Sequence, residues 1–172
     1  MKIETDEISY RRASIDDVEA LMCCRVRFLN ELHNHPDDEQ TEFLRKSLRQ
    51  YFYKAITSND FVAWVAEHNE GIIGTGGMVV WQRPSNYGGL ESGKLGYLLN
   101  FYTIPEARRK GICTRLLNEL IKEARLTGLR YLHLNATKDG IRMYRKAGFA
   151  EPDDTELELR LEYGILPRCT NK

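Results

Sequence analysis

The spacing of apolar residues predicts two amphipathic helices in the first third of the chain. Apolar side chains recur every three or four positions over residues 15–32, as on one face of a helix. Ser14 and Asp17 have the spacing of a capping box at its start, and Pro36 predicts its end just upstream. A second helix is expected to begin at residues 37–39, where acidic side chains favour a helix N-terminus. The positions expected to be buried are Ile15, Val18, Leu21, Met22, Val26, Leu29 and Leu32 on the first helix, and Phe43, Leu44, Leu48, Tyr51, Phe52 and Ala55 on the second.

Extended apolar segments predict the strands of a sheet. Residues 8–12, 61–66 and 72–81 have the composition of strands, and a polar turn at 67–71 joins the last two. The segment 94–103 is largely apolar on both faces, which is typical of a strand covered on both sides. Strict alternation places Tyr97, Leu99, Phe101 and Thr103 on one face of this strand, and Leu98, Asn100 and Tyr102 on the other.

A strand, a turn and a helix follow one another at the centre of the sequence. The apolar run 98–104 stops at Pro105, and helical spacing resumes at Ile112 and continues to Ala124. The turn between them reads Arg108-Arg109-Lys110-Gly111. The first N–H groups of a helix lack partners and lie at the positive end of its dipole, so this turn favours a phosphate-bearing ligand. On spacing alone, a solvated surface turn is the alternative interpretation.

The remaining elements complete the predicted topology. Gly128 is expected to end the central helix, and residues 131–134 form the next strand, parallel to the central one because a strand-helix-strand unit returns the chain in the same direction. Thr137 and Gly148 are expected to bracket a short helix. Further strands are expected from residue 149 onward.

Together these elements predict an α/β fold with one mixed, mostly antiparallel sheet of about seven strands and four helices. The seventh strand is expected at 156–161, where polar and apolar residues alternate. Three glycines, Gly74, Gly76 and Gly77, indicate a bulge or a close backbone approach. The chain is expected to be a single domain over residues 1–172, with a core at about 8–163 and a frayed tail at 164–172.

Composition excludes several classes of protein and partner. Lysine and arginine together number 25, as do aspartate and glutamate, and this balance argues against a nucleic acid partner. The chain has neither a signal-peptide pattern at its start nor an apolar run of about 20 residues, so a cytoplasmic protein with no membrane contact is expected. Its cysteines are expected to be reduced, and His33 and His35 lack a third ligand nearby, so no metal site is expected.

The central turn resembles the acetyl-CoA signature of the GNAT superfamily of N-acetyltransferases. That signature is Arg/Gln-x-x-Gly-x-Gly/Ala, and Arg108, Gly111 and Cys113 occupy its marked positions. The preceding Tyr-Thr-Ile-Pro-Glu at 102–106 is similar to the family's Val-x-Pro-Glu, and 144–149 matches its Tyr-x-x-x-Gly-Phe. Cys113 departs from the family's glycine or alanine, and weaker cofactor binding is expected there. The resemblance implies a sheet with a splayed central pair, and transfer of acetyl from acetyl-CoA to a primary amine by direct attack.

The resemblance also implies the site residues. Tyr144 is the expected general acid for the leaving thiolate, with a packed core aromatic as the alternative. The expected cofactor contacts are Phe101, Tyr102 and Thr103 on the strand, Arg108, Arg109, Lys110, Gly111, Ile112, Cys113 and Thr114 at the turn, and Asn135 or Thr137 further on. Thr137 is alternatively only a helix cap. Cys113 as an acyl-carrying nucleophile is a further alternative, because a helix N-terminus lowers a thiol pKa.

Acceptor recognition is the least determined part of the prediction. The acceptor is expected to be a small-molecule or peptide amine, recognised by the first two helices, their connection and the loop at 82–93, in a monomer or homodimer. The general base stays open among Glu31, His33, Glu91 and a water molecule. Two other functions are compatible with the residues: an acyl-CoA-binding sensor without catalysis, and a module that binds phosphate groups of nucleic acid or protein.

Overall fold

The computed structural model describes residues 3–69, 71–85, 87, 93–153 and 159 of the 172-residue chain. Four α-helices and five strands form in these residues, connected by short 3₁₀ turns. The elements are β1 (Ser9–Arg12), α1 (Val18–His33), α2 (Glu39–Thr57), β2 (Phe61–His68), β3 (Gly71–Gln82), β4 (Lys94–Thr103), α3 (Ile112–Leu126), β5 (Leu132–His133) and α4 (Ile141–Lys146). Every helix expected from the sequence is present, and none within the described residues is both long and apolar enough to cross a lipid bilayer.

The strands form one mixed sheet in the order β1-β2-β3-β4-β5. The first four strands pair antiparallel, and β5 pairs parallel to β4, so the predicted sheet type is confirmed. The described residues give five strands rather than about seven. Residues 149–153 form no strand, whereas the seventh expected strand and the tail at 164–172 lie outside the described residues. The expected loop at 82–93 is only partly described.

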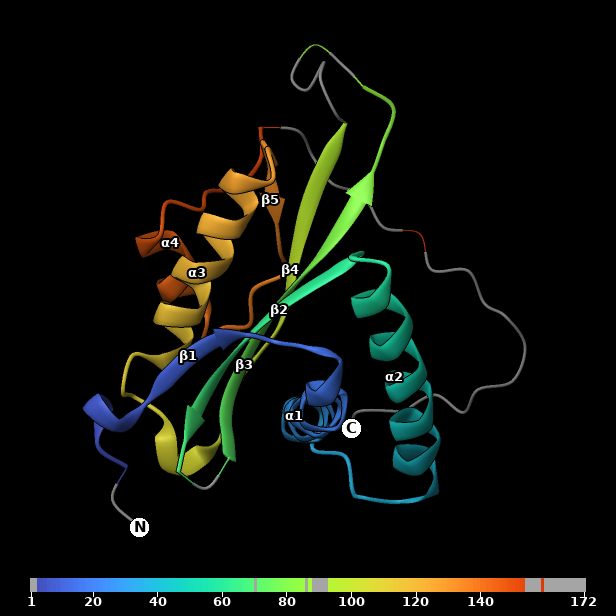
Figure 1. The fold of residues 1–172 in the computed structure, drawn as a ribbon, viewed down its shortest axis with the longest axis vertical. Helices are drawn as coiled ribbons and strands as arrows, with labels where there is room; N and C mark the ends of the chain where they lie inside the picture. The colour runs from blue at the N-terminus through green and yellow to red at the C-terminus, as the bar shows by residue number, and fades with distance from the viewer. Residues whose placement is uncertain (1–2, 70, 86, 88–92, 154–158, 160–172) are drawn as a thin grey trace.

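The helices cover the sheet on both faces (Figure 1). α1 and α2 lie on one side, and α3 and α4 lie on the other. The first side encloses one apolar cluster of α1, α2 and β2 residues, and the second side encloses two clusters centred on α3. The side chains with almost no exposure include Leu21, Val26, Val65, Met78, Leu116, Leu117 and Leu120.

The expected buried faces of the first two helices are only partly correct. Phe52 and Ala55 of α2 are buried, but Phe43 is 77% exposed and Tyr51 is 42% exposed. The physical reason is that α2 is an outer helix, packed along one stripe against α1 and β2, so the apolar residues beside that stripe face solvent. Ile15 and Leu32, at the two ends of the first predicted helix, are likewise exposed, at 38% and 49%.

The capping box at Ser14 forms as predicted and is tied to the sheet. The backbone N–H of Ser14 donates to an Asp17 carboxylate oxygen at 2.7 Å, and the Asp16 N–H donates to the Ser14 hydroxyl at 3.2 Å. The Arg11 guanidinium donates to both Asp17 oxygens, at 2.7 and 2.8 Å, and also to Glu67 of β2. Hydrogen bonds from Arg11 lower the pKa of the buried Asp17 carboxyl below its ordinary value. This network fixes the start of α1 against the edge of the sheet.

The glycines of β3 permit close packing, as their positions predicted. A Cβ atom at Gly74 would lie 2.7 Å from Ile112 of α3, and one at Gly76 would lie 2.8 Å from the Phe101 ring. A Cβ at Gly77 would lie 2.3 Å from the ring of Phe61. The pairing of β3 with β4 also shifts register between Thr75 and Gly77, and the extra residue of this bulge lies in β4 rather than among the glycines. The central strand and the start of α3 therefore lie directly against the β3 backbone.

Candidate active site

The turn between β4 and α3 is built by two left-handed residues. Pro105 begins a short 3₁₀ turn after β4, and the chain then passes through Arg109 with φ 65° and Gly111 with φ 78°. Gly111 is the N-cap of α3 and supplies no side-chain hydrogen bond to the helix. A Cβ atom at Gly111 would meet no atom within 4 Å, so the space in front of the helix is open.

Consecutive backbone donors line this opening. Among the described residues, no acceptor receives the N–H groups of 109–114, and the first amide of α3 with a partner is Arg115, which donates to the Gly111 carbonyl at 3.0 Å. These donors lie at the positive end of a fifteen-residue helix. Arg109 and Lys110 make no ion pair with any described residue, so both cations are available to a ligand. The arrangement fits a phosphate or pyrophosphate group.

Cys113 does not obstruct the donors, because its side chain is directed toward the sheet. Its Sγ lies 3.1 Å from the hydroxyl oxygen of Thr103 at the end of β4. Burial raises the pKa of the Cys113 thiol, and the hydrogen bond with Thr103 and the nearby Arg108 only partly oppose this effect. The thiol is therefore protonated at neutral pH, which disfavours the alternative of Cys113 as an acyl-carrying nucleophile.

β4 separates from β5 beside the turn. The two strands pair only at Gly96 with Leu132 and at Tyr97 with His133, whereas β4 continues to Thr103. Within the described residues, the later half of β4 has no strand partner on its β5 side. Its backbone groups on that edge are therefore available to a ligand that enters between the strands, which is the arrangement expected from the family resemblance.

A bulge in β4 corrects the predicted assignment of side chains to faces. Asn100 adopts φ 61°, and Asn100 and Phe101 together lie opposite Gly76 of β3. The extra residue reverses the alternation, because a bulge places two residues of one strand against one of its partner. Phe101 therefore shares the α3 face with Leu98. The prediction that Phe101 lies on the same face as Tyr97 and Leu99 is wrong, and so is the prediction that Tyr102, which bonds to Glu31 of α1, shares the face of Leu98.

Asn100 is a residue of the site that the sequence analysis assigned only to a face of the strand. Its side chain is 3% exposed, and neither its amide oxygen nor its amide nitrogen has a hydrogen-bond partner among the described residues. Its carbonyl accepts a hydrogen bond from the Thr75 hydroxyl at 2.9 Å. The signal in the sequence was the residue type itself, since asparagine is enriched among non-glycine residues with positive φ.

Tyr144 of α4 contacts the bulged segment of β4 through its ring. Its ring makes edge-to-face contacts with Phe101 and Phe149, both with ring centroids 5.8 Å apart. Burial raises the pKa of the Tyr144 phenol, and the nearby Cys113 adds to the shift. The raised pKa keeps the phenol protonated at neutral pH. Its hydroxyl makes no hydrogen bond with a described residue, so the proton is available to donate. Tyr144 thus combines the packing of a core aromatic with the state that a general acid requires.

Arg108 contacts α1 rather than the open turn. Its guanidinium donates to a Glu31 carboxylate oxygen at 2.5 Å and to the Thr103 carbonyl at 3.0 Å. The Tyr102 hydroxyl donates to the other Glu31 oxygen at 2.6 Å. Burial and the Glu31 carboxylate raise the pKa of Tyr102 to about 12. Burial acts to raise the pKa of Glu31, but the hydrogen bonds from Tyr102 and Arg108 outweigh it and lower the pKa. Arg108 as a phosphate contact stays a prediction.

The other predicted site residues are distributed more widely. Thr137 accepts a hydrogen bond from the Gly140 N–H at 3.2 Å in the turn before α4, consistent with a capping role. Asn135 and His33 are exposed, and Glu91 lies outside the described residues. No group of three or more His, Cys, Asp and Glu side chains in the described part of the chain is arranged to hold a metal ion.

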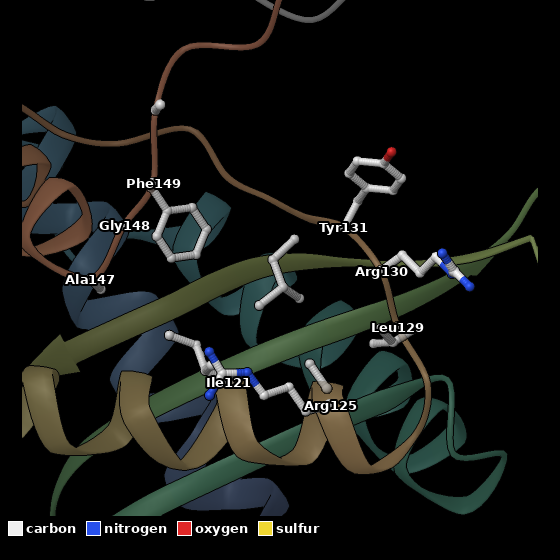
Figure 2. A pocket seen from close by; sticks show the side chains of 11 residues that line it. Ile121, Arg125, Leu129, Arg130, Tyr131, Ala147, Gly148 and Phe149 are labelled. Carbon is white, nitrogen blue, oxygen red and sulfur yellow. The ribbon is translucent and has the colours of Figure 1, made fainter. Parts of the chain in front are cut away.

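A hollow with a volume of about 370 Å³ lies near the C-terminal end of α3, away from the turn (Figure 2). The Phe149 and Tyr131 side chains and the Arg125 side chain of α3 border it. None of the site residues predicted from the sequence lines this hollow. The candidate active site is therefore the turn and the split between β4 and β5.

Comparisons with known proteins agree with this class of site. The profile of the Acetyltransferase (GNAT) family matches residues 28–149. A predicted acetyltransferase from Clostridium acetobutylicum, crystallised with acetyl-CoA, is 33% identical, with a TM-score of 0.79 over 89% of this chain and 96% of that one. This chain therefore belongs to the GNAT acetyltransferase family, as the sequence resemblance indicated.

More distant solved structures share the fold. A GCN5-related N-acetyltransferase from Ralstonia eutropha JMP134 is 23% identical, with a TM-score of 0.75 over 88% of this chain and 98% of that one. Glucosamine-6-phosphate N-acetyltransferase from Arabidopsis thaliana is 17% identical, with a TM-score of 0.64 over 88% and 97%. A search of curated proteins found no match to this chain.

Proposed function

We propose that this protein transfers the acetyl group of acetyl-CoA to a primary amine by direct attack. The observation that carries the proposal is the row of unpartnered amides at 109–114, which follows the edge of β4 that lacks a strand partner, where the Phe101 ring contacts Tyr144. The relative from Clostridium acetobutylicum, which was crystallised with acetyl-CoA, supports the choice of donor.

The residues at the turn suit the phosphate end of the donor. The N–H groups of 109–114 and the side chains of Arg109 and Lys110 would hold the pyrophosphate. Backbone groups of Phe101, Tyr102 and Thr103 on the edge of β4 that lacks a strand partner would hold the pantetheine arm and the acetyl carbonyl, apart from the Thr103 carbonyl, which accepts a hydrogen bond from Arg108. When bound, acetyl-CoA supplies a thioester carbonyl that an amine attacks without a protein nucleophile.

Tyr144 has the role of general acid in this proposal. As the carbon–nitrogen bond forms and the carbon–sulfur bond breaks, Tyr144 donates its phenolic proton to the leaving thiolate. The attacking amine loses a proton to the solvent. Tyr144 then regains a proton from the solvent. The raised pKa keeps Tyr144 protonated before the reaction, as an acid must be. Residues on the acceptor side of the site would decide whether the amine belongs to a peptide or to a small molecule.

The test combines melting temperature with thiol release. A ligand that binds only the folded state raises the melting temperature, so acetyl-CoA and CoA should each do so. Release of CoA thiol is then measured with amines, peptides and aminoglycosides. Thiol release with any acceptor supports the transferase, whereas binding without release across a broad panel supports the non-catalytic sensor. No shift of the melting temperature at saturating acetyl-CoA would refute the proposed donor site.

A further inference from the structure

Arg25 of α1 is a half-buried cation without a carboxylate partner. In the described part of the chain it makes no ion pair and no side-chain hydrogen bond, and its guanidinium carbon lies 5.6 Å from the centroid of the Phe28 ring. Burial lowers the pKa of Arg25, while the phenols of Tyr97 and Tyr51 act to raise it. Because an arginine keeps its proton in proteins, the side chain stays charged in these surroundings.

Arg25 differs in this respect from many arginines of the same chain. Those that pair with an aspartate or glutamate among the described residues are Arg11, Arg12, Arg45, Arg49, Arg108, Arg115 and Arg145. Removal of a charge from water is unfavourable unless an opposite charge or hydrogen bonds compensate for it. An aromatic face compensates only in part. The surroundings of Arg25 therefore lack one component, an anion, that a ligand could supply.

The position of Arg25 places this cation beside the reaction site. Tyr97, which acts electrostatically on Arg25, is the last β4 residue that pairs with β5. Six positions further along α1, Glu31 bonds to Tyr102, near the end of β4. α1 therefore packs against β4, and its C-terminal part lies beside the segment of β4 that has no partner on the β5 side.

The donor and the acceptor can be assigned to opposite faces of the sheet. α3, with its phosphate-binding turn, covers one face, and α1 and α2 cover the other (Figure 1). A donor held along α3 leaves the α1 side of the split β4 for the acceptor. The Phe28 ring beside Arg25 supplies apolar surface on that side.

We propose that Arg25 binds an anionic group of the acceptor, so that the acceptor is a small molecule with both a primary amine and a carboxylate or phosphate. The guanidinium plane suits both oxyanions, because it donates two parallel hydrogen bonds to either. This inference rests on the proposed acetyl transfer and narrows its substrate class. Polyamines and aminoglycosides, which lack such a group, do not satisfy Arg25.

The first experiment measures anion binding without turnover. The parent, Arg25→Met and Arg27→Met proteins are melted in saturating CoA, which fills the phosphate-binding turn, with added phosphate, acetate or chloride at constant ionic strength. Arg27→Met is the matched control, because Arg27 is an exposed residue of the same helix. Phosphate or acetate should raise the melting temperature of the parent and of Arg27→Met more than that of Arg25→Met. Without added anion, Arg25→Met should melt no lower than the parent, since it removes an unpaired charge.

The second experiment compares acceptors that differ only in the anionic group. Phosphoethanolamine is compared with ethanolamine, and β-alanine with its amide, in the presence of acetyl-CoA. The two pairs distinguish a phosphate from a carboxylate. In the parent, kcat/KM should favour the anionic member of at least one pair, and Arg25→Met should reduce that preference about 10- to 150-fold, the range expected for a lost charge-assisted hydrogen bond.

The outcomes separate this inference from the proposed function. Equal anion effects on the melting of all three proteins, or an equal loss of activity on both members of a pair, would overturn the role of Arg25. If none of the four amines is acetylated, the melting temperatures of the three proteins alone decide whether Arg25 binds an anion. Failure of acetyl-CoA to raise the melting temperature of the parent would instead refute the donor site and leave the anion result to stand by itself.

Discussion

Two glycines that flank α3 offer a matched test of the proposed phosphate-binding turn. Gly111 at its N-terminus has φ 78°, and Gly128 beyond its C-terminus has φ 74°. At both positions a Cβ would meet no atom within 4 Å, so alanine introduces backbone strain without a steric clash. The left-handed region costs a non-glycine residue about 1–2 kcal/mol. For a chain of this length, each kcal/mol lowers the melting temperature by about 2–4 °C, so both variants should melt about 2–8 °C below the parent.

Only one of the two substitutions should affect the donor. Relief of the strain at Gly111 reorients the amides of 109–114, whereas relief at Gly128 alters a turn at the other end of the helix. Loss of one hydrogen bond to a charged group costs about 1.5–3 kcal/mol, which is about a 10- to 150-fold rise in Kd. Calorimetric titration with acetyl-CoA should show this rise for Gly111→Ala and an unchanged Kd for Gly128→Ala. Equal affinities in the two variants would refute the assignment of these amides to the phosphate.

The other predictions concern catalysis, packing and pH. Tyr144→Phe should lower kcat about 100- to 10,000-fold with little change in melting temperature, because ring contacts remain while the acid is lost; unchanged turnover would exclude Tyr144 as the acid. Gly76→Ala should cost about 1–3 kcal/mol of unfolding free energy and slow turnover, because the new methyl group displaces Phe101; denaturant titration beside a turnover assay measures both. Asp17 has a lowered folded pKa, so its stabilising effect is full above its unfolded pKa of about 3.9 and is lost as pH falls through the folded pKa. The difference in melting temperature between the parent and Asp17→Asn should therefore shrink below about pH 4, and a difference independent of pH would contradict the ion pair with Arg11.

Features of the fold that depend on neighbouring residues could be predicted from the sequence. The capping box at Ser14 and Asp17, the end of α1 at His33 and the left-handed Gly128 each depend on a few neighbouring residues. The turn at Gly111 belongs to the same class, since its conformation and its free amides follow from the start of a helix. Such features are decided within one or two turns of the chain, which is the range over which residue patterns are informative.

Features that depend on distant partners could not be predicted in this way. The face of Phe101 was wrongly assigned because the bulge at Asn100 exists only in the pairing with β3. The contact of Arg108 with Glu31 joins residues 77 positions apart, and no spacing signals it. The exposure of Phe43 is likewise set by how α2 packs on α1 rather than by its own periodicity. Three-dimensional neighbours, rather than residue type, decided each of these outcomes.

The close contact of Gly74 with Ile112 has a consequence for where inactivating substitutions will be found. The start of α3 rests on the β3 backbone at a position where only a hydrogen atom fits. Any side chain there would lift the helix, and with it the donors of the turn, although Gly74 itself lies behind the helix. A screen for variants deficient in acetyl-CoA binding should therefore recover Gly74 on the sheet as readily as residues of the turn. Gly74 thus sets the distance between α3 and the sheet, and through it the position of the backbone donors, from behind the helix.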